Sequence, residues 1–286
     1  MRQRQTNPFD PNLDSGFLRF LYRPVLGAPL RFLMTRKWVS QLGGAYMDAG
    51  ISKYRIAKFV KSNHIDLSDY EDRPYSSFND FFTRKILPYK RVFSSDPADF
   101  CSPADSRLSA FKVEENAVFT IKSNPFTLEE LLCDKALAKE YAKGMVLVFR
   151  LSVDDYHRYA FFDGGKVASA PRYVPGAFHT VRPIAFAHQR RVLCQNAREV
   201  TVLQTENFGK AIQIEVGAMM VGRIVNHPKE EFLRAEEKGY FAFGGSTVVL
   251  ILKEGAVELD PVFFENTANG LETRVLCGET IGKKLQ

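Results

Sequence analysis

The chain has 286 residues, of which 45% are hydrophobic and 25% charged, and its formal net charge is +6. This composition excludes a wholly disordered, collagen-like or coiled-coil protein and indicates a globular fold of one or two domains. The four cysteines form no C-x-x-C pair, which argues against a disulfide framework or a structural zinc site, so we expect reduced, mostly buried thiols and no metal.

Most of the positive charge lies in the first forty residues, which hold seven basic side chains and two acidic ones. Between Phe17 and Val39 the basic residues alternate with large apolar ones, and no stretch has the roughly 18 uncharged apolar residues that a spanning helix needs. A secretory signal peptide is not expected, because no uninterrupted apolar region follows the polar start. Such a segment is typical of the headgroup zone of an anionic membrane. The candidate membrane contacts are Arg19, Arg23, Arg31 and Trp38.

The same segment also has a purely structural interpretation. Its residues could form a helical pair packed on the rest of the fold, with the arginines in solvent. The residues alone do not decide between the two. Nucleic acid is not the expected partner, because no helix-turn-helix, zinc finger or RNP-like signature occurs.

Predicted helices dominate the first ninety residues. Apolar residues recur at helical spacing over 43–61, and Ser76 or Ser77 can cap a short helix over 78–82. A further helix is predicted over 127–143, where a T-x-x-E capping box opens the segment and a glycine follows it.

Strand patterns follow from residue 145 onward. Short β-branched segments, separated by glycine, asparagine or charged turns, lie at 145–153, 199–205, 211–216, 219–225 and 246–252. We therefore expect an α+β protein. A helical, basic region over 1–95 would pack on a β-rich domain of sandwich or barrel-like form over 96–286.

Two glycines, Gly244 and Gly245, stand immediately before Ser246 at the start of the last of these strands. The plain interpretation is a tight turn that needs positive φ. The chemical interpretation is that the serine attacks the preceding carbonyl once a base takes its proton, because Gly245 has no side chain to obstruct a tetrahedral intermediate. Taken alone, the turn leaves both interpretations open.

Six stretches resemble the phosphatidylserine decarboxylase family and occur in the family's order. They are SFNDFFTRKI (77–86), SPADS (102–106), DYHRY (155–159), YVPGAFHTV (173–181), ENFGKAIQIEVGAMMVGRI (206–224) and KGYFAFGGSTVVL (238–250). The resemblance implies a self-processing enzyme that cleaves its chain between Gly245 and Ser246, giving a large chain 1–245 and a small chain 246–286. Ser246 would become a covalent pyruvoyl group. This group would form a Schiff base with the amine of phosphatidylserine and accept the electrons released as carbon dioxide leaves, so that phosphatidylethanolamine is the product.

The resemblance also implies roles for an aspartate and for histidines, each with a structural alternative. Asp105 matches the aspartate that orients the base for self-cleavage, although alone it could form an Asx-turn or a helix cap. His157 matches a family histidine in DYHRY, yet many members carry a second histidine three residues later, where this chain has Ala160. Because alanine cannot move a proton, we expect His179, oriented by Asp105, to be the cleavage base, with His157 acting mainly in turnover. His188 is a weaker candidate, and the alternative is that His157 does both jobs while His179 only packs.

These implications extend to partners and location. We expect a peripheral protein on the cytoplasmic side of an anionic membrane, with phosphatidylserine as substrate, the two chains of one precursor held together, and a homodimer left open. Two rival functions remain. A pyruvoyl decarboxylase of a soluble amino acid would not need the segment 17–39, and an unprocessed lipid-binding homologue without activity would be favoured by Ala160.

Overall fold

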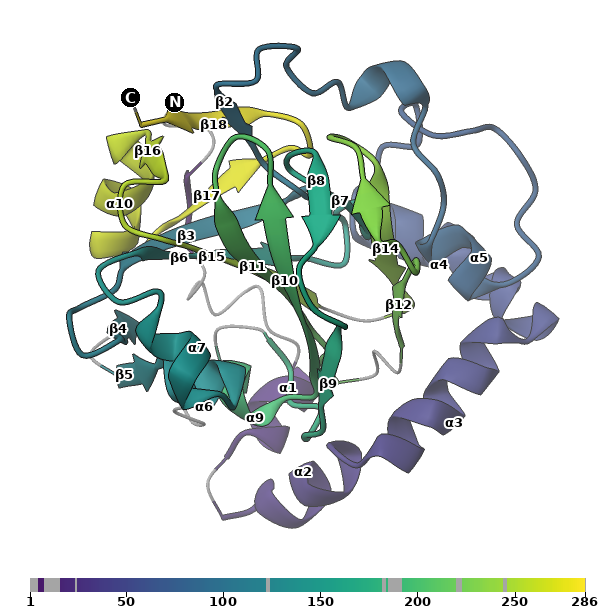
Figure 1. The fold of residues 1–286 in the computed structure, drawn as a ribbon. Coiled ribbons are helices and arrows are strands. Elements are labelled where there is room, and N and C mark those ends of the chain that lie inside the picture. The colour runs from purple at the N-terminus through teal and green to yellow at the C-terminus, as the bar shows by residue number, and fades with distance from the viewer. Residues whose placement is uncertain are drawn as a thin grey trace.

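The computed structural model describes residues 5–7, 16–23, 25–121, 124–181, 184, 192–219, 223–243 and 246–285. Within these ranges most helices precede residue 90, and strands dominate from residue 99 onward (Figure 1). The α+β class expected from the sequence is confirmed. None of the described helices combines the length and the apolar character that crossing a membrane requires.

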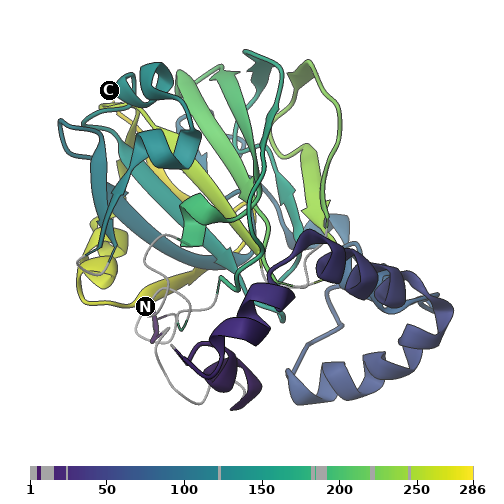
Figure 2. The same ribbon diagram turned by 90° about the horizontal axis from the view of Figure 1, so that it is seen from below.

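Short helices make up the N-terminal part of the fold. They are α1 (Gly16–Leu21), α2 (Ala28–Met34), α3 (Lys37–Asp48), the 3-10 helix η3 (Gly50–Arg55), α4 (Ile56–Ser62), α5 (Phe78–Phe82) and the 3-10 helix η4 (Pro88–Lys90). The helical segment predicted over 43–61 is therefore divided, because Ala49 takes an extended conformation between α3 and η3. Ser77 caps α5, as predicted, since its hydroxyl accepts a hydrogen bond from the Asp80 amide at 3.1 Å. Figures 1 and 2 show α1 to α3 along one side of the molecule, outside the main sheet.

One large antiparallel sheet forms the body of the protein. Its strand order is β1-β17-β3-β6-β15-β11-β10-β8-β13, and β9 also pairs with β10. The bounds are β1 (Gln5–Thr6), β3 (Ser106–Lys112), β6 (Met145–Leu151), β8 (Gly165–Val167), β9 (Arg172–Val174), β10 (Arg198–Thr205), β11 (Lys210–Val216), β13 (Glu231–Phe232), β15 (Ser246–Leu252) and β17 (Glu272–Val275). The outer strands β1 and β13 do not pair with each other, so this sheet is open and the barrel-like form expected from the sequence is wrong.

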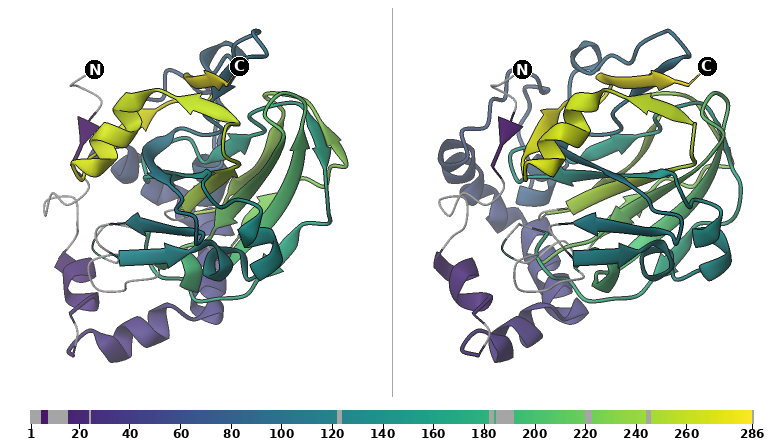
Figure 3. Two further views of the ribbon diagram at one scale, coloured as in Figure 1. Left: turned by 60° about the vertical axis from the view of Figure 1, so that its left-hand side comes forward. Right: turned by 90° about the vertical axis from the view of Figure 1, so that its left-hand side faces the viewer.

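Smaller sheets and the remaining helices surround the large sheet. One sheet has the order β12-β14-β7, a second β16-β18-β2, and a hairpin joins β4 to β5. Their bounds are β2 (Asp99–Cys101), β4 (Val118–Ile121), β5 (Asn124–Thr127), β7 (Arg158–Ala160), β12 (Ile224–Asn226), β14 (Glu237–Phe241), β16 (Val257–Leu259) and β18 (Thr280–Lys284). The helices are α6 (Leu128–Leu132), α7 (Lys135–Lys139), α9 (Val192–Gln195) and α10 (Pro261–Ala268). Figure 3 shows α10 beside β3 and β17, which it contacts.

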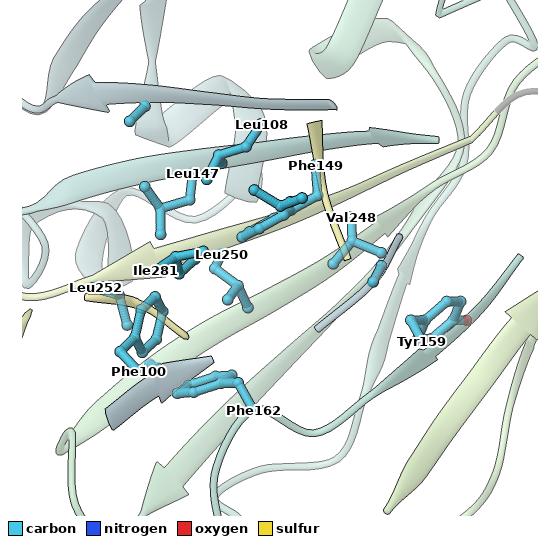
Figure 4. Close-up of a cluster of buried hydrophobic side chains, with 14 of the residues drawn as sticks. Phe100, Leu108, Leu147, Phe149, Tyr159, Phe162, Val248, Leu250, Leu252 and Ile281 are labelled. Atoms are coloured by element: carbon cyan, nitrogen blue, oxygen red, sulfur yellow. The ribbon is translucent and has the colours of Figure 1, made fainter. Parts of the chain in front are cut away.

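Strand β15 lies at the centre of the large sheet, between β6 and β11, and all seven of its residues are buried. Successive side chains point to opposite faces, so Val248 and Leu250 enter one core while Val249 and Ile251 enter the other. The first core includes Phe149 and the aromatic side chains near β2 (Figure 4). Each fully buried side chain of this size contributes about 1.5–3 kcal/mol. The two cores therefore fix the position at which β15 begins.

Three local predictions need correction. The helix expected over 127–143 is split into α6 and α7, because Cys133 takes a left-handed conformation with φ of 48° and Asp134 caps a new helix. The strand expected over 219–225 is present only as β12, and residues 220–222 lie outside the described residues. All four cysteines are free thiols, but only Cys101 and Cys277 are buried.

Candidate active site

Ser246 is the first residue of β15 and lies opposite Leu151 of β6. Its side chain is fully buried, and its hydroxyl has no hydrogen-bond partner among the described residues. A buried polar group without a partner is rare in proteins and calls for an explanation, such as a reaction. The predicted cleavage bond joins Ser246 to Gly245, which lies, like Gly244, outside the described residues.

His157 lies in the turn that follows β6, and it is also buried. Its Nδ1 is 2.9 Å from the carbonyl oxygen of Asp155, which can only accept a hydrogen bond, so Nδ1 carries the hydrogen and Nε2 carries a lone pair. Nε2 is buried and has no partner within the described part of the chain. Burial, assisted by the positive charge of Arg84, lowers the pKa of His157 to about 3. The ring is therefore neutral at pH 7, and Nε2 can accept a proton.

Aromatic contacts connect the turn before Ser246 with His157. The Phe82 ring of α5 lies 4.0 Å from the His157 ring between centroids, and the Phe243 ring lies 5.3 Å from that of Phe82. The amide of Phe243 donates to Oδ1 of Asn79 at 2.9 Å. Phe243 is three positions before Ser246 in the sequence. Leu151, which lies opposite Ser246, is the last residue of β6, and the turn to His157 follows it. The aromatic contacts and this turn therefore both bring Ser246 and His157 to the same end of the main sheet.

Asp155 supports this turn, although the sequence did not single it out. Its Oδ2 accepts hydrogen bonds from Nη1 of Arg107 at 2.5 Å and from the amide of Ser152 at 2.7 Å, whereas its Oδ1 is buried and has no partner among the described residues. Burial raises the pKa of Asp155 to about 7, although the charge of Arg107 acts in the opposite direction. The adjacent pair of aspartates in DDYHRY was the available signal.

Asp105 is buried and bound to Arg91 rather than to a histidine. Its carboxylate accepts hydrogen bonds from Nε and Nη2 of Arg91 at 2.8 and 2.6 Å, and from the amide of Cys277 at 2.8 Å. The structure therefore does not show the expected orientation of His179 by Asp105. In the same loop, the carbonyl of Pro103 accepts a hydrogen bond of 2.9 Å from the amide of the buried Ala160. The position at which many family members carry a second histidine thus lies beside the Asp105 loop.

His179 lies in the segment that follows β9, near the end of β11. Asn196 holds its backbone, because Oδ1 accepts from the His179 amide at 2.9 Å and Nδ2 donates to the His179 carbonyl at 2.8 Å. Nδ2 of Asn196 also donates to the carbonyl of Gly217, which follows the end of β11. Burial, assisted by Arg31, lowers the pKa of His179 to about 4, and its Nδ1 is buried with no partner among the described residues. His188, the weaker candidate, lies outside the described residues.

Arg84 is a buried cation beside the site that sequence reasoning missed. Its guanidinium lies 4.1 Å from the Tyr70 ring centroid and 4.6 Å from that of Phe81, and Nη1 donates to the Phe81 carbonyl at 3.2 Å. Nε and Nη2 form no hydrogen bond within the described ranges. Its position in FFTRKI, two residues after Phe82, was the only sequence signal. No group of three or more His, Cys, Asp or Glu side chains among the described residues is arranged to hold a metal ion.

Comparison with known proteins assigns the chain to an enzyme class. Residues 78–283 match the model of the family described as phosphatidylserine decarboxylase. The chain is 42% identical over 276 residues to phosphatidylserine decarboxylase proenzyme 2 of Clostridium acetobutylicum, covering 96% of this chain and 94% of that protein. It is 39% identical to the proenzyme of Ruminiclostridium cellulolyticum (98% and 95% covered) and 38% identical to that of Fusobacterium nucleatum (95% and 92% covered). The protein is a decarboxylase, and the chain belongs to the phosphatidylserine decarboxylase family.

Proposed function

We propose that this chain cleaves itself before Ser246 and then converts phosphatidylserine to phosphatidylethanolamine and carbon dioxide through a pyruvoyl group made from that serine. One observation supports this most strongly. The Ser246 hydroxyl and Nε2 of His157 are both buried, both lack a partner among the described residues, and lie at the same end of the main sheet. The relatives are named proenzymes, which agrees with a precursor that is processed into two chains.

In this proposal His157 is the base for self-cleavage and also acts in substrate turnover. This is the alternative to the expectation that His179 is the cleavage base. Nε2 takes the proton of the Ser246 hydroxyl, and the oxygen attacks the carbonyl carbon of Gly245. The new ester bond replaces the peptide bond, and the proton passes to the freed amine of Ser246. Elimination of the Gly245 carboxylate and hydrolysis with loss of ammonia then leave the pyruvoyl group at the start of the small chain. His179 stays as an untested second candidate.

The residues around Ser246 fit such a prosthetic group. When formed, the pyruvoyl group supplies an electrophilic carbonyl that accepts electrons from the substrate. The protein holds the source serine in a fully buried position at the start of β15. His157 can take up a proton at Nε2, which makes the ring cationic, and return it to the substrate carbon; the nearby Arg84 charge favours that return. One serine and one histidine would thus serve both self-cleavage and decarboxylation.

We also propose that the helical region over 1–95 rests on the cytoplasmic side of an anionic membrane. The exposed large apolar side chains of this region that precede residue 55 support this. They are Phe17, Phe20, Val25, Leu26, Phe32, Leu33, Trp38, Leu42, Tyr46, Ile51 and Tyr54. Exposed apolar residues interspersed with arginines are typical of interfacial segments. Since the relatives match this chain nearly from end to end, the segment 17–39 belongs to the shared sequence, which disfavours a soluble amino acid as substrate. A homodimer is left open.

Vesicle binding tests the membrane part of this proposal. Replacing Arg19, Arg23 and Arg31 with glutamine should weaken co-sedimentation with phosphatidylserine vesicles, because each basic residue near an anionic surface contributes about 1 kcal/mol. Added salt should weaken binding of the unmodified chain in the same direction.

A matched control removes the same charge elsewhere. Lys135, Lys139 and Lys166 are exposed and lie in α7 and β8, and their replacement by glutamine should leave vesicle binding nearly unchanged. Equal losses in the two triple variants would show that only net charge matters and would assign the arginines to the fold.

A further inference from the structure

A pocket of about 910 Å³ lies between the N-terminal helices and the segment that carries His179. Its lining includes the cationic side chains of Arg31, Arg36 and Lys37, the aromatic side chains of Phe32 and Trp38, and His179. Among the described residues, none of those that line it is acidic. Three positive charges in one pocket attract an anion of matching size.

The pocket is held by contacts between its two walls. The amide of Phe178 donates to the carbonyl of Thr35 at 3.1 Å, which joins the end of α2 to the segment before His179. The amide of Thr180 donates to the hydroxyl of the fully buried Tyr22 at 3.0 Å. The Tyr22 ring also meets the His179 ring edge-on, with 6.5 Å between centroids. The walls are therefore fixed before any ligand binds.

Two of the three cations have defined positions. Nη1 of Arg31 donates to the carbonyl of Leu21 at 3.1 Å, and the Arg36 guanidinium lies 3.6 Å from the centroid of the Phe32 ring. Nδ1 of His179 is buried and lacks a partner among the described residues, while the nearby Arg31 charge disfavours a proton on the ring. A bound anion would offset the charge of all three cations and offer hydrogen-bond acceptors to Arg36 and Lys37.

We propose that this pocket binds the phosphate of an anionic membrane phospholipid, with Arg36 and Lys37 as its main donors. Phosphate oxygens suit such donors, and the acyl chains would meet the exposed apolar side chains of α2 at the rim, Phe32 and Leu33. This apolar rim favours a lipid over free phosphate. The inference rests on the proposed membrane association and adds a specific lipid site to it. Asn196, which binds the carbonyls of both His179 and Gly217, places this site beside the sheet end that holds Ser246.

Trp38 supplies a direct readout, because it lines the pocket and is the single tryptophan of the chain. The uncleaved Ser246→Ala chain is titrated with dihexanoyl-phosphatidylglycerol below its micelle concentration, and the Trp38 fluorescence is followed. We expect a saturable change. Replacing Arg36 and Lys37 with glutamine should raise the Kd about tenfold or more, whereas Arg36→Lys with Lys37→Arg should keep binding. No response to the lipid would overturn the proposal.

Two comparisons separate this site from general charge effects and from free phosphate. Lys135→Gln with Lys139→Gln removes the same charge from exposed positions of α7 outside the pocket and outside the helical region 1–95, and should leave the Kd within about twofold. An equal loss in both double variants would contradict a specific pocket. Inorganic phosphate that reproduced the full change at the same concentration would overturn the lipid as occupant. Self-cleavage of each double variant with Ser246 intact, measured on a denaturing gel, reports on the catalytic proposal separately.

Discussion

The carbonyl oxygen of Asp155 accepts a hydrogen bond from Nδ1 of His157 at 2.9 Å, and this bond determines which ring nitrogen is free. Nε2 is left as an acceptor in a buried position, with no partner among the described residues. Because the bond comes from the backbone, it does not depend on the protonation of the Asp155 side chain. The turn that follows β6 thus prepares the imidazole to act as a base.

The first prediction separates the two histidines. His157→Ala should accumulate uncleaved chain, because the Ser246 hydroxyl then loses its base, whereas His179→Ala should still cleave. Loss of a positioned general base typically costs 10²–10⁴-fold in rate. Time courses on denaturing gels measure this directly. Blocked cleavage in His179→Ala with normal cleavage in His157→Ala would return the base to His179.

The second prediction concerns stability against pH. The folded pKa of His157, about 3, is lower than the unfolded value of 6.5, so the unfolded state binds this proton more readily between those values. The contribution of His157 is therefore full above pH 6.5 and is lost as the pH falls toward 3. At pH 5 the loss is about 2 kcal/mol, since each unit corresponds to about 1.4 kcal/mol. Urea unfolding of the Ser246→Ala chain, with and without His157→Gln, should show a shallower acid loss in the double variant.

Asp155 gives a control of opposite sign. Its folded pKa, about 7, is above the unfolded value of 3.8, so its contribution is full below 3.8 and is lost as the pH rises through 7. Asp155→Asn should therefore make the loss of stability on acidification steeper. Identical slopes in the His157 and Asp155 variants would mean that neither group titrates as the structure indicates.

The third prediction concerns Arg84, a positioning residue whose charge acts on His157. Replacing Arg84 with methionine should raise the pKa of His157, because the nearby positive charge disfavours protonation of the ring. The acid limb of the cleavage rate should move to higher pH, and Arg84→Lys should restore it in part. The rate is followed from pH 4 to 8 on denaturing gels. An unchanged pH profile at a lowered rate would indicate that Arg84 only packs against Tyr70 and Phe81.

The fourth prediction concerns the ion pair between the buried Asp105 and the half-buried Arg91. Arg91→Met should lower the free energy of unfolding by about 3–5 kcal/mol, since it leaves the buried Asp105 without its counter-charge. Asp105→Asn should cost less, because the half-buried Arg91 keeps its ion pair with Asp69. The double variant should lose clearly less than the sum of the two. Urea unfolding in the Ser246→Ala background measures all three. Additive losses would show that the pair is not coupled, and the role of Asp105 would then lie elsewhere.

The sequence predicted what depends on local pattern. Strand β15 was expected with its observed bounds, because seven consecutive residues suit a fully buried strand, and Ser77 was recognised as a possible cap of α5. The sequence pattern did not predict the pairing of Asp105 with Arg91 or the position of Arg84 near His157. Those contacts join side chains whose association depends on tertiary packing, which hydrophobic periodicity does not encode. The split between α6 and α7 was missed because it depends on one left-handed residue that is not glycine.

The mass of the purified polypeptide tests the central claim most directly. Self-cleavage before Ser246 should yield two chains, the smaller of about 4.6 kDa in proportion to its share of the 32.4 kDa precursor, and blocked at its N-terminus by the pyruvoyl group. Ser246→Ala should give one intact chain. An intact, full-length mass for the unmodified chain, after long incubation with phosphatidylserine vesicles, would contradict the proposed mechanism.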